Sequence, residues 1–210
     1  MFIGHYAVGF VLKKKSTDIP LWLLFVSVQF VDILAFLFVL LGIEKITYNP
    51  STNPFLRTTL EYVPYSHSLF PNALLSLVVC VIFWKFKSKE WGITLSVGVF
   101  SHLFIDTLVH AGDMPFFHDS LKVGVGLWHF PWVSYLLELS VFFLSGYYLL
   151  KNYKKMKRHV VLIVLLSAGF SAMFFAPEGK VSSEVASITS LSLYAIFALL
   201  AYWSEHEIRH

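Results

Sequence analysis

The chain has 210 residues, of which 57% are hydrophobic and 14% are charged, whereas soluble domains carry about 25% charged residues. This composition excludes an ordinary soluble enzyme and indicates an integral membrane protein. The net charge of +3 is small and its lysines occur in short clusters between apolar runs, which argues against nucleic acid as a partner. No polar segment is long enough to fold separately, so we expect residues 1–210 to form one integral membrane domain.

The chain opens with a short apolar run, about residues 2–12, that ends at the lysines of residues 13–15. The positive charges follow the apolar run, which is the reverse of a secretory signal, so we expect this segment to be retained. It is too short to cross a hydrocarbon core of about 30 Å, which takes about 20 helical residues. We therefore expect a half-inserted helix whose backbone is shielded by other helices.

Six later runs are long enough to cross a membrane. They lie near residues 20–43, 66–86, 91–111, 127–150, 159–176 and 184–204. The sequence therefore predicts an all-α, polytopic membrane helix bundle with about six transmembrane helices and a short, half-inserted N-terminal helix.

Lysine clusters mark alternate connections between these runs, at residues 13–15, 85–89 and 151–158. By the positive-inside rule, we expect these three connections to face the cytoplasm. The connections at 44–65, 111–126 and 177–184 then face outward. The first two contain prolines, polar residues and aromatics that suit ordered structure.

Several ionisable residues lie inside the apolar runs, where each costs at least about 2.5 kcal/mol near the membrane centre. Each therefore needs a partner, a water-filled cavity or a functional role. The group comprises His5, Asp32, His67, His102, Asp106 and Glu138.

The segment "VFSHLFIDTLVHAGDMPFF" carries the most informative spacing. His102 and Asp106 stand four residues apart, share one helix face and can bind one metal ion together. His110 continues the same face but would be about 12 Å from His102 on a continuous helix, so we expect it at the rim. Counted from the cytoplasmic ends of their runs, Asp32 and His102 have similar depths and can meet. His67 begins its run from the outer side, so a cavity that opens outward is predicted.

A family resemblance follows from the order of these residues. "GHYAVG" contains His5, the next helix contains Asp32, "YSHSL" contains His67, and "SHLFID" contains His102 and Asp106. Over about the first 140 residues this order resembles the YdjM-like family of bacterial inner-membrane-associated metal-dependent hydrolases. The resemblance implies a location in the bacterial inner membrane and a hydrolytic metal site.

Two motifs depart from the pattern of that family. Its Pro-Asp-x-Asp is reduced here to "VDIL", and its His-Arg-Gly-x-Thr-His-Ser is reduced to "EYVPYSHS". A missing ligand would then come from another residue such as Glu61 or Glu138.

A set of histidines and carboxylates with an open position suits Zn²⁺, which activates water at neutral pH. We assign His67, His102 and Asp106 as metal ligands. His5 and Asp32 are candidates for a fourth ligand or for orienting the other ligands. Glu138 is the candidate general base. Glu138 and Asp32 are the predicted catalytic residues.

The expected reaction is hydrolysis of a lipid or lipid-linked ester, phosphoester or amide from the outer half of the bilayer. His110, Asp113, Lys122 and His129 are expected at the substrate entrance, where Lys122 would meet an anionic headgroup.

Two other functions remain open. The same Asp–His series could carry protons or a metal ion through a small transporter or channel, which requires a polar path to the cytoplasm. Alternatively, the polar groups could only bridge helices in a membrane scaffold, which predicts paired side chains and no cavity.

Overall fold

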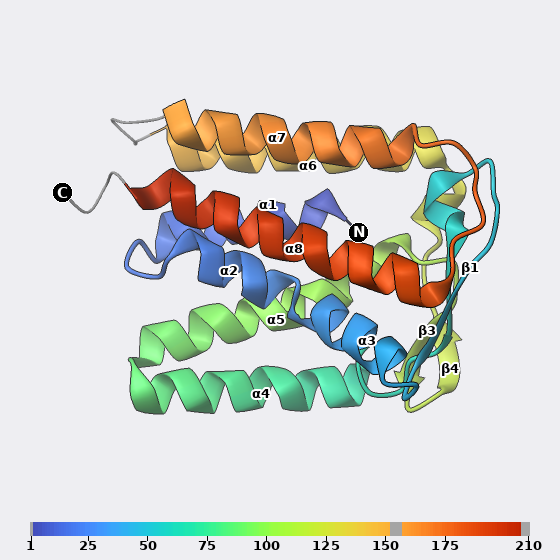
Figure 1. The fold of residues 1–210 in the computed structure, drawn as a ribbon. Coiled ribbons are helices and arrows are strands. Elements are labelled where there is room, and N and C mark those ends of the chain that lie inside the picture. Colours follow the sequence, from blue (N-terminus) through green and yellow to red (C-terminus); the bar gives the residue numbers. More distant parts are fainter. Residues whose placement is uncertain (1, 152–156, 207–210) are drawn as a thin grey trace.

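The computed structural model describes residues 2–151 and 157–206 and shows a helical bundle with two small two-stranded sheets at one end (Figure 1). The helices are α1 (Ile3–Lys15), α2 (Leu21–Val28), α3 (Phe30–Leu40), α4 (Leu69–Phe86), α5 (Lys89–Val109), α6 (Pro131–Leu150), α7 (Lys157–Phe174) and α8 (Ser183–Glu205). Within this described part, α4 to α8 are long and apolar enough to cross a membrane, and α2 with α3 forms a sixth, bent candidate. The predicted all-α membrane bundle is confirmed.

The first expected span, residues 20–43, is broken and does not form one helix. Its two halves meet at Gln29 with a bend of 58°. The bend makes Val28 the last residue of α2, and carbonyl groups in the last turn of a helix lack intrahelical partners. It also places Asp32 in the first turn of α3, where a carboxylate is favoured by the helix dipole.

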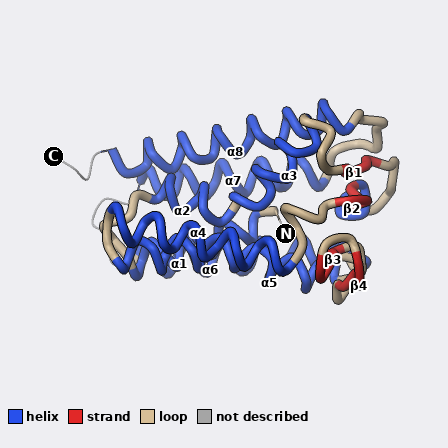
Figure 2. Tube along the Cα trace, turned by 90° about the horizontal axis from the view of Figure 1, so that it is seen from below, coloured by secondary structure: helices blue, strands red, loops and turns tan. Residues whose placement is uncertain are grey.

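The N-terminal helix α1 begins inside the bundle and runs toward one end, as Figures 1 and 2 both show. It packs against α2, α5 and α6, and its Ile3, Tyr6 and Phe10 are fully buried. A helix that starts inside a membrane leaves backbone N–H groups without partners. Here a side chain of α6 supplies the acceptor, because Glu138 Oε2 accepts from the N–H groups of Phe2, Ile3 and Gly4 at 3.0 to 3.3 Å.

Two hairpins cover the end of the bundle toward which α1 does not run (Figure 2). Strand β1 (Lys45–Tyr48) pairs antiparallel with β2 (Thr58–Tyr62), with the short helix η1 (Pro54–Arg57) between them. Strand β3 (Met114–Phe117) pairs antiparallel with β4 (Ser120–Val123), and the short helix η2 (Leu127–His129) follows. The connections 44–65 and 111–126, in which ordered structure was expected, therefore form hairpins. We call this end of the bundle the hairpin end.

The lysine clusters lie at the opposite end, where α1, α4 and α6 finish and α2, α5 and α7 begin (Figure 1). Of the third cluster, residues 152–156 lie outside the described residues. Lys13 closes this end by pairing with Glu205 at 2.7 Å and donating to the carbonyl oxygens of Thr17 and Ile19. That this end faces the cytoplasm stays a prediction.

Candidate metal centre

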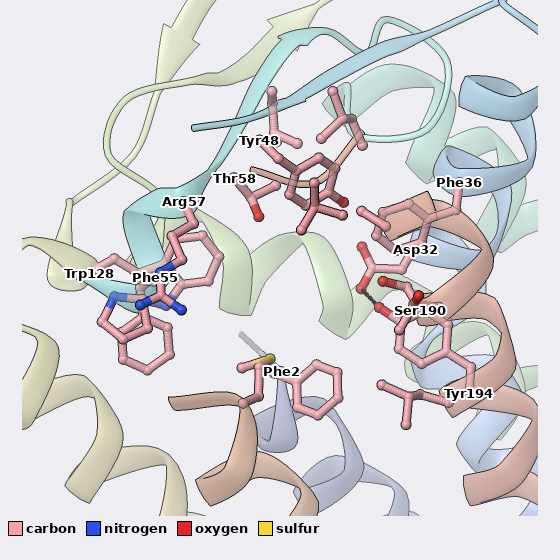
Figure 3. A pocket seen from close by; sticks show the side chains of 18 of the residues that line it. Phe2, Asp32, Phe36, Tyr48, Phe55, Arg57, Thr58, Trp128, Ser190 and Tyr194 are labelled. Atoms are coloured by element: carbon pink, nitrogen blue, oxygen red, sulfur yellow. Dashed lines mark hydrogen bonds between the residues drawn. The ribbon is translucent and has the colours of Figure 1, made fainter. Parts of the chain in front are cut away.

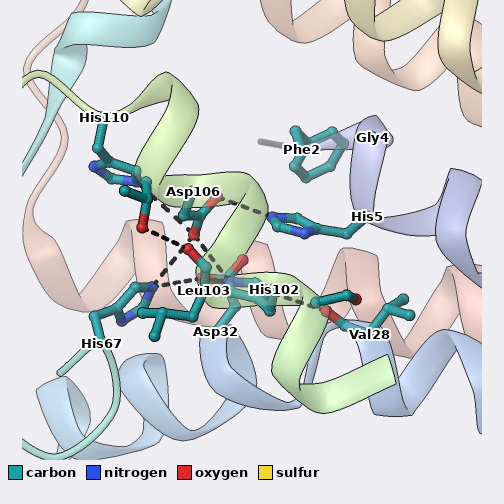
Figure 4. Close-up of polar contacts among 12 residues, drawn as sticks. Phe2, Gly4, His5, Val28, Asp32, His67, His102, Leu103, Asp106 and His110 are labelled. Atoms are coloured by element: carbon teal, nitrogen blue, oxygen red, sulfur yellow. Dashed lines mark hydrogen bonds and ion pairs between the residues drawn. The ribbon is translucent and has the colours of Figure 1, made fainter. Parts of the chain in front are cut away.

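Four polar side chains from separate segments meet inside the bundle (Figure 4). Asp32 comes from α3, His67 from the turn before α4, and His102 and Asp106 from successive turns of α5. One donor atom from each lies within 4.8 Å of the others. The three residues other than Asp32 are almost fully buried. We call these four residues the Asp–His group.

The separations within this group suit a common ion. His102 Nε2 is 3.1 Å from Asp106 Oδ2 and 3.4 Å from Asp32 Oδ1. His67 Nε2 is 3.3 Å from Asp32 Oδ1 and 3.8 Å from Asp106 Oδ2. Donors at 2.0–2.1 Å from one tetrahedral ion stand about 3.3–3.4 Å apart. The Asp–His group can hold a metal ion.

The hydrogen bond of His102 Nδ1 determines whether its Nε2 carries a proton or a lone pair. Nδ1 lies 2.7 Å from the carbonyl oxygen of Val28, which only accepts hydrogen bonds, so Nδ1 carries the proton. In the neutral ring, Nε2 then presents a lone pair to the carboxylates of Asp32 and Asp106, and it has no hydrogen-bond partner. A lone pair facing two anions needs a cation or a proton between them, and an imidazole held by its other nitrogen is typical of metal ligands.

The same reasoning applies to His67. Ser66 Oγ donates to Glu44 Oε2 at 2.6 Å, so the oxygen of Ser66 is left to accept from His67 Nδ1 at 2.9 Å. Glu44 is itself held by the backbone N–H of Tyr65 and Ser66. This chain from Glu44 through Ser66 turns the lone pair of His67 Nε2 toward the two aspartates.

His5 lies against the group, as its position on α1 led us to expect. Its ring stacks on that of His102 with centroids 3.8 Å apart, and its Nε2 is 3.1 Å from Asp106 Oδ1. It therefore approaches the carboxylate oxygen that His102 does not, and it stands beside the four-residue set. Helix α1 packs against α5, which carries His102, so His5 reaches the group from a neighbouring helix.

His110 lines the cavity and lies nearer the Asp–His group than a continuous helix would place it. Helix α5 ends at Val109, and His110 leaves it in an extended conformation. Its Nε2 is thereby 3.9 Å from Asp106 Oδ2, and its Nδ1 is 2.9 Å from Asp113 Oδ1. The distance of about 12 Å assumed a continuous helix, and the helix end removes that assumption.

Comparisons of the chain with protein-family models, with curated proteins and with solved structures find no match. The chemistry of the site therefore follows from its own geometry.

A cavity of about 550 Å³ adjoins the Asp–His group on the side of the hairpin end (Figure 3). Asp32, His67, Asp106 and His110 line it, together with hydroxyl groups and many apolar side chains. Its volume lies in the range of small-molecule sites. The remaining lining residues include Phe2, Phe36, Ile46, Tyr48, Phe55, Arg57, Thr58, Trp128, Met173, Val185, Thr189, Ser190, Leu193 and Tyr194.

Three residues expected at the entrance do not line this cavity: Asp113, Lys122 and His129. Lys122 pairs with Asp119 and donates to the carbonyl oxygens of Leu60 and Glu61, because the register of its hairpin brings it to the edge of β2. His129 belongs to η2. The cation at the cavity is Arg57, which the sequence analysis did not single out.

Asp113 holds His110 in place. Its Oδ2 accepts from the backbone N–H of Leu60 at 3.1 Å while its Oδ1 faces His110 Nδ1. Burial opposes ionisation of Asp113, but the hydrogen bonds from His110 and from the backbone outweigh it and hold the pKa of Asp113 below its usual value. The carboxylate therefore remains an acceptor for the proton on His110 Nδ1.

Neither glutamate proposed to complete the site belongs to the Asp–His group. Glu138 Oε2 accepts from the N-terminus of α1, and Oε1 is a buried oxygen without a hydrogen-bond partner among the described residues. Glu61 lies outside at the hairpin end, where a hydrogen bond from Lys45 lowers its pKa. Ser66 is a further residue that the sequence did not single out, and its place directly before His67 in "YSHS" was the available signal.

Proposed function

We propose that this chain is a membrane-embedded, metal-dependent hydrolase of a lipid or lipid-linked ester, phosphoester or amide. The observation that carries the proposal is the orientation of His67 and His102, whose hydrogen-bonded outer nitrogens turn two lone pairs toward two aspartates beside an apolar cavity. The resemblance of the motif order to the YdjM-like family supports the same activity.

Two imidazole nitrogens and two carboxylate oxygens suit Zn²⁺ or another divalent first-row ion. The charge of such an ion would balance the two aspartates. A bound ion of this kind supplies a Lewis acid and lowers the pKa of a coordinated water to about 7. Asp32, His67, His102 and Asp106 would hold it, and Tyr194 orients Asp32 by donating to its Oδ2 at 3.0 Å.

His110 takes the role of proton carrier that the sequence analysis gave to Glu138. Its ring lines the cavity, and the hydrogen bond of Nδ1 with Asp113 leaves the lone pair of Nε2 on the side of Asp106. This pair of side chains can take a proton from water at Nε2 and return it to the leaving group. Asp113 fixes the tautomer that this transfer needs.

The packing below the Asp–His group favours hydrolysis over transport. Between the group and the lysine-bearing end lie Phe10 on α1, Phe25 on α2 and Leu95 on α5, and each is at most 1% exposed. A proton or ion path to that end would have to pass these side chains. The cavity likewise argues against a scaffold, for which paired polar groups and no cavity were expected.

The proposal is tested by purifying the protein in mild detergent without chelator, supplying zinc, and assaying lipid esters, phosphoesters and amides of one chain length. We expect bound zinc and hydrolysis that chelator abolishes and added zinc restores. His110→Gln should keep the metal and lower kcat by about 10²-fold to 10⁴-fold. Chelator-insensitive turnover, or no turnover of any of the three classes by zinc-loaded protein, would contradict the proposal.

A further inference from the structure

One wall of the cavity carries a single cation. Arg57 is the only lysine or arginine among the described residues that line the cavity. Figure 3 shows it beside Phe55 and Trp128, with Asp32 and Tyr194 on the opposite wall. The guanidinium group and the Asp–His group therefore face the same cavity from two sides.

The side chain of Arg57 is positioned but not neutralised. Its Nε donates to the backbone carbonyl oxygen of Ser51 at 3.0 Å, which directs the guanidinium group from its base. A guanidinium group has five N–H donors in a planar fork, so four remain for a ligand. No carboxylate in residues 2–151 and 157–206 forms an ion pair with Arg57.

The charges around the cavity are complementary to an anion. Asp32 and Asp106 contribute two negative charges, which a divalent ion would balance. Arg57, which is partly exposed, then leaves one positive charge at a largely apolar cavity. An anionic ligand would supply a counter-charge and charge-assisted hydrogen bonds, and a neutral ester or amide would not.

On the basis of the proposed hydrolase function, we propose that the substrate is a phosphoester of an apolar alcohol. Its phosphate oxygens bind the planar fork of Arg57, which matches phosphate with two parallel hydrogen bonds. The phosphate lies between Arg57 and the Asp–His group, and the alkyl chain lies along apolar side chains such as Phe36 and Val185. Val185 is 55% exposed on the outside of α8, where a lipid chain can reach the cavity.

The reaction this assigns is hydrolysis at phosphorus. The oxygen of water bonds to phosphorus and the bond from phosphorus to the alcohol oxygen breaks. The proton that His110 takes from the water passes to the leaving oxygen. The products are the free alcohol and inorganic phosphate, or a phosphomonoester if the substrate is a diester.

The test compares binding of dodecyl phosphate and of the uncharged ester dodecyl acetate to zinc-loaded protein in mild detergent, by calorimetry or thermal shift. Wild type is compared with Arg57→Gln, with Arg57→Lys, and with Lys45→Gln. Lys45→Gln removes one positive charge at the same end of the molecule but outside the cavity. Zinc content is measured for every variant.

Arg57→Gln should weaken dodecyl phosphate binding by about 10-fold to 100-fold, since it removes charge-assisted hydrogen bonds. Arg57→Lys should recover part of this affinity because lysine keeps the charge but not the fork. Lys45→Gln should bind as wild type does, and dodecyl acetate should not respond to any of these changes.

Two results would overturn the phosphoester assignment while leaving a metal-dependent hydrolase in place: equal binding of dodecyl phosphate by Arg57→Gln and wild type, or zinc-dependent turnover confined to carboxylic esters or amides. If Arg57→Gln does not fold, equal affinity of wild type for dodecyl phosphate and dodecyl acetate overturns it. Absence of zinc from the wild type would overturn the proposed function and the substrate class together.

Discussion

Two buried carboxylates on successive apolar helices, Asp106 on α5 and Glu138 on α6, have different surroundings. Glu138 Oε2 is met by three backbone N–H donors at the start of α1. Asp106 is met by histidine nitrogens, among them the lone pair of His102 Nε2 at 3.1 Å. Oxygen Oε2 of the first carboxylate accepts from backbone N–H groups, whereas the second carboxylate faces a nitrogen lone pair with which it can share a cation or a proton.

The difference shows that the direction of the neighbouring donors, and not burial of the carboxylate, marks a metal site. Both side chains are almost fully buried, and both interrupt apolar sequence in the same way. Only the atoms around them separate a structural role from a metal-binding one. Substitutions that remove the charge without changing the shape of each side chain test this distinction.

The largest effect is expected for Asp106→Asn. The variant should lose zinc, and with it the stabilisation that metal gives the wild type, which is about 4 kcal/mol when free zinc is 1,000 times its Kd. In chelator the difference in stability between Asp106→Asn and the wild type should vanish or change sign. The reason is that an amide can donate to the lone pair of His102 Nε2, whereas the carboxylate could only repel it. Thermal unfolding of both proteins with zinc and with chelator checks this. Equal destabilisation under both conditions would show that Asp106 is structural.

Ser66→Ala should have the next largest effect, because it breaks the chain that orients His67 Nε2. Loss of a group that orients a metal ligand typically weakens metal affinity by about 10-fold to 100-fold. The matched control is Ser76→Ala, since Ser76 bonds only to the carbonyl oxygen of Asn72 within α4. Competition with a zinc indicator gives both affinities, and equal values for the two variants would remove Ser66 from the site.

Glu138→Gln should leave zinc binding unchanged and lower stability by about 1 kcal/mol, since the N–H groups of α1 would exchange a charged acceptor for a neutral one. The fall in melting temperature should be the same with zinc and with chelator. A loss of zinc from this variant would return Glu138 to the metal site and erase the contrast with Asp106.

The smallest effect is expected at Asp113, whose carboxylate accepts hydrogen bonds from His110 and from the backbone N–H of Leu60. Because its pKa is lowered in the folded state, its ionised form contributes stability above the unfolded pKa of about 3.9, and this contribution is lost as pH falls through the lower folded value. Asp113→Asn should therefore destabilise the chelated protein by about 1 kcal/mol or less near pH 7. The difference from wild type should shrink near pH 3, and a difference that grows with acid would contradict the assignment.

Much of the architecture could be predicted from the sequence because membrane spans are set by length and hydropathy. The positions of six apolar runs, the short first helix and the meeting of Asp32 with His102 all follow from that pattern. The break at Gln29 could not, since no proline or glycine occurs there. It is accompanied by a tertiary contact, the hydrogen bond of His102 with the Val28 carbonyl oxygen. The end of α5 before His110 is marked in the sequence only by Gly112, two residues later.

The sequence also could not distinguish a carboxylate that binds metal from one that accepts hydrogen bonds at a helix N-terminus. Glu138 and Asp106 have the same cost in hydrocarbon, and only the position of the start of α1 shows that Glu138 Oε2 accepts from backbone N–H groups. Arg57 was missed for a related reason. It lies in a polar outer connection where a cation needs no explanation, and only the fold brings it to the cavity of the Asp–His group.

The most direct measurement is the zinc content of the purified wild type beside those of Asp106→Asn and Glu138→Gln, each supplied with zinc and then freed of excess. Near-stoichiometric zinc in the wild type and in Glu138→Gln, with none in Asp106→Asn, is the result expected if the Asp–His group binds the ion. Zinc in the wild type no higher than in Asp106→Asn would contradict a metal centre at this position.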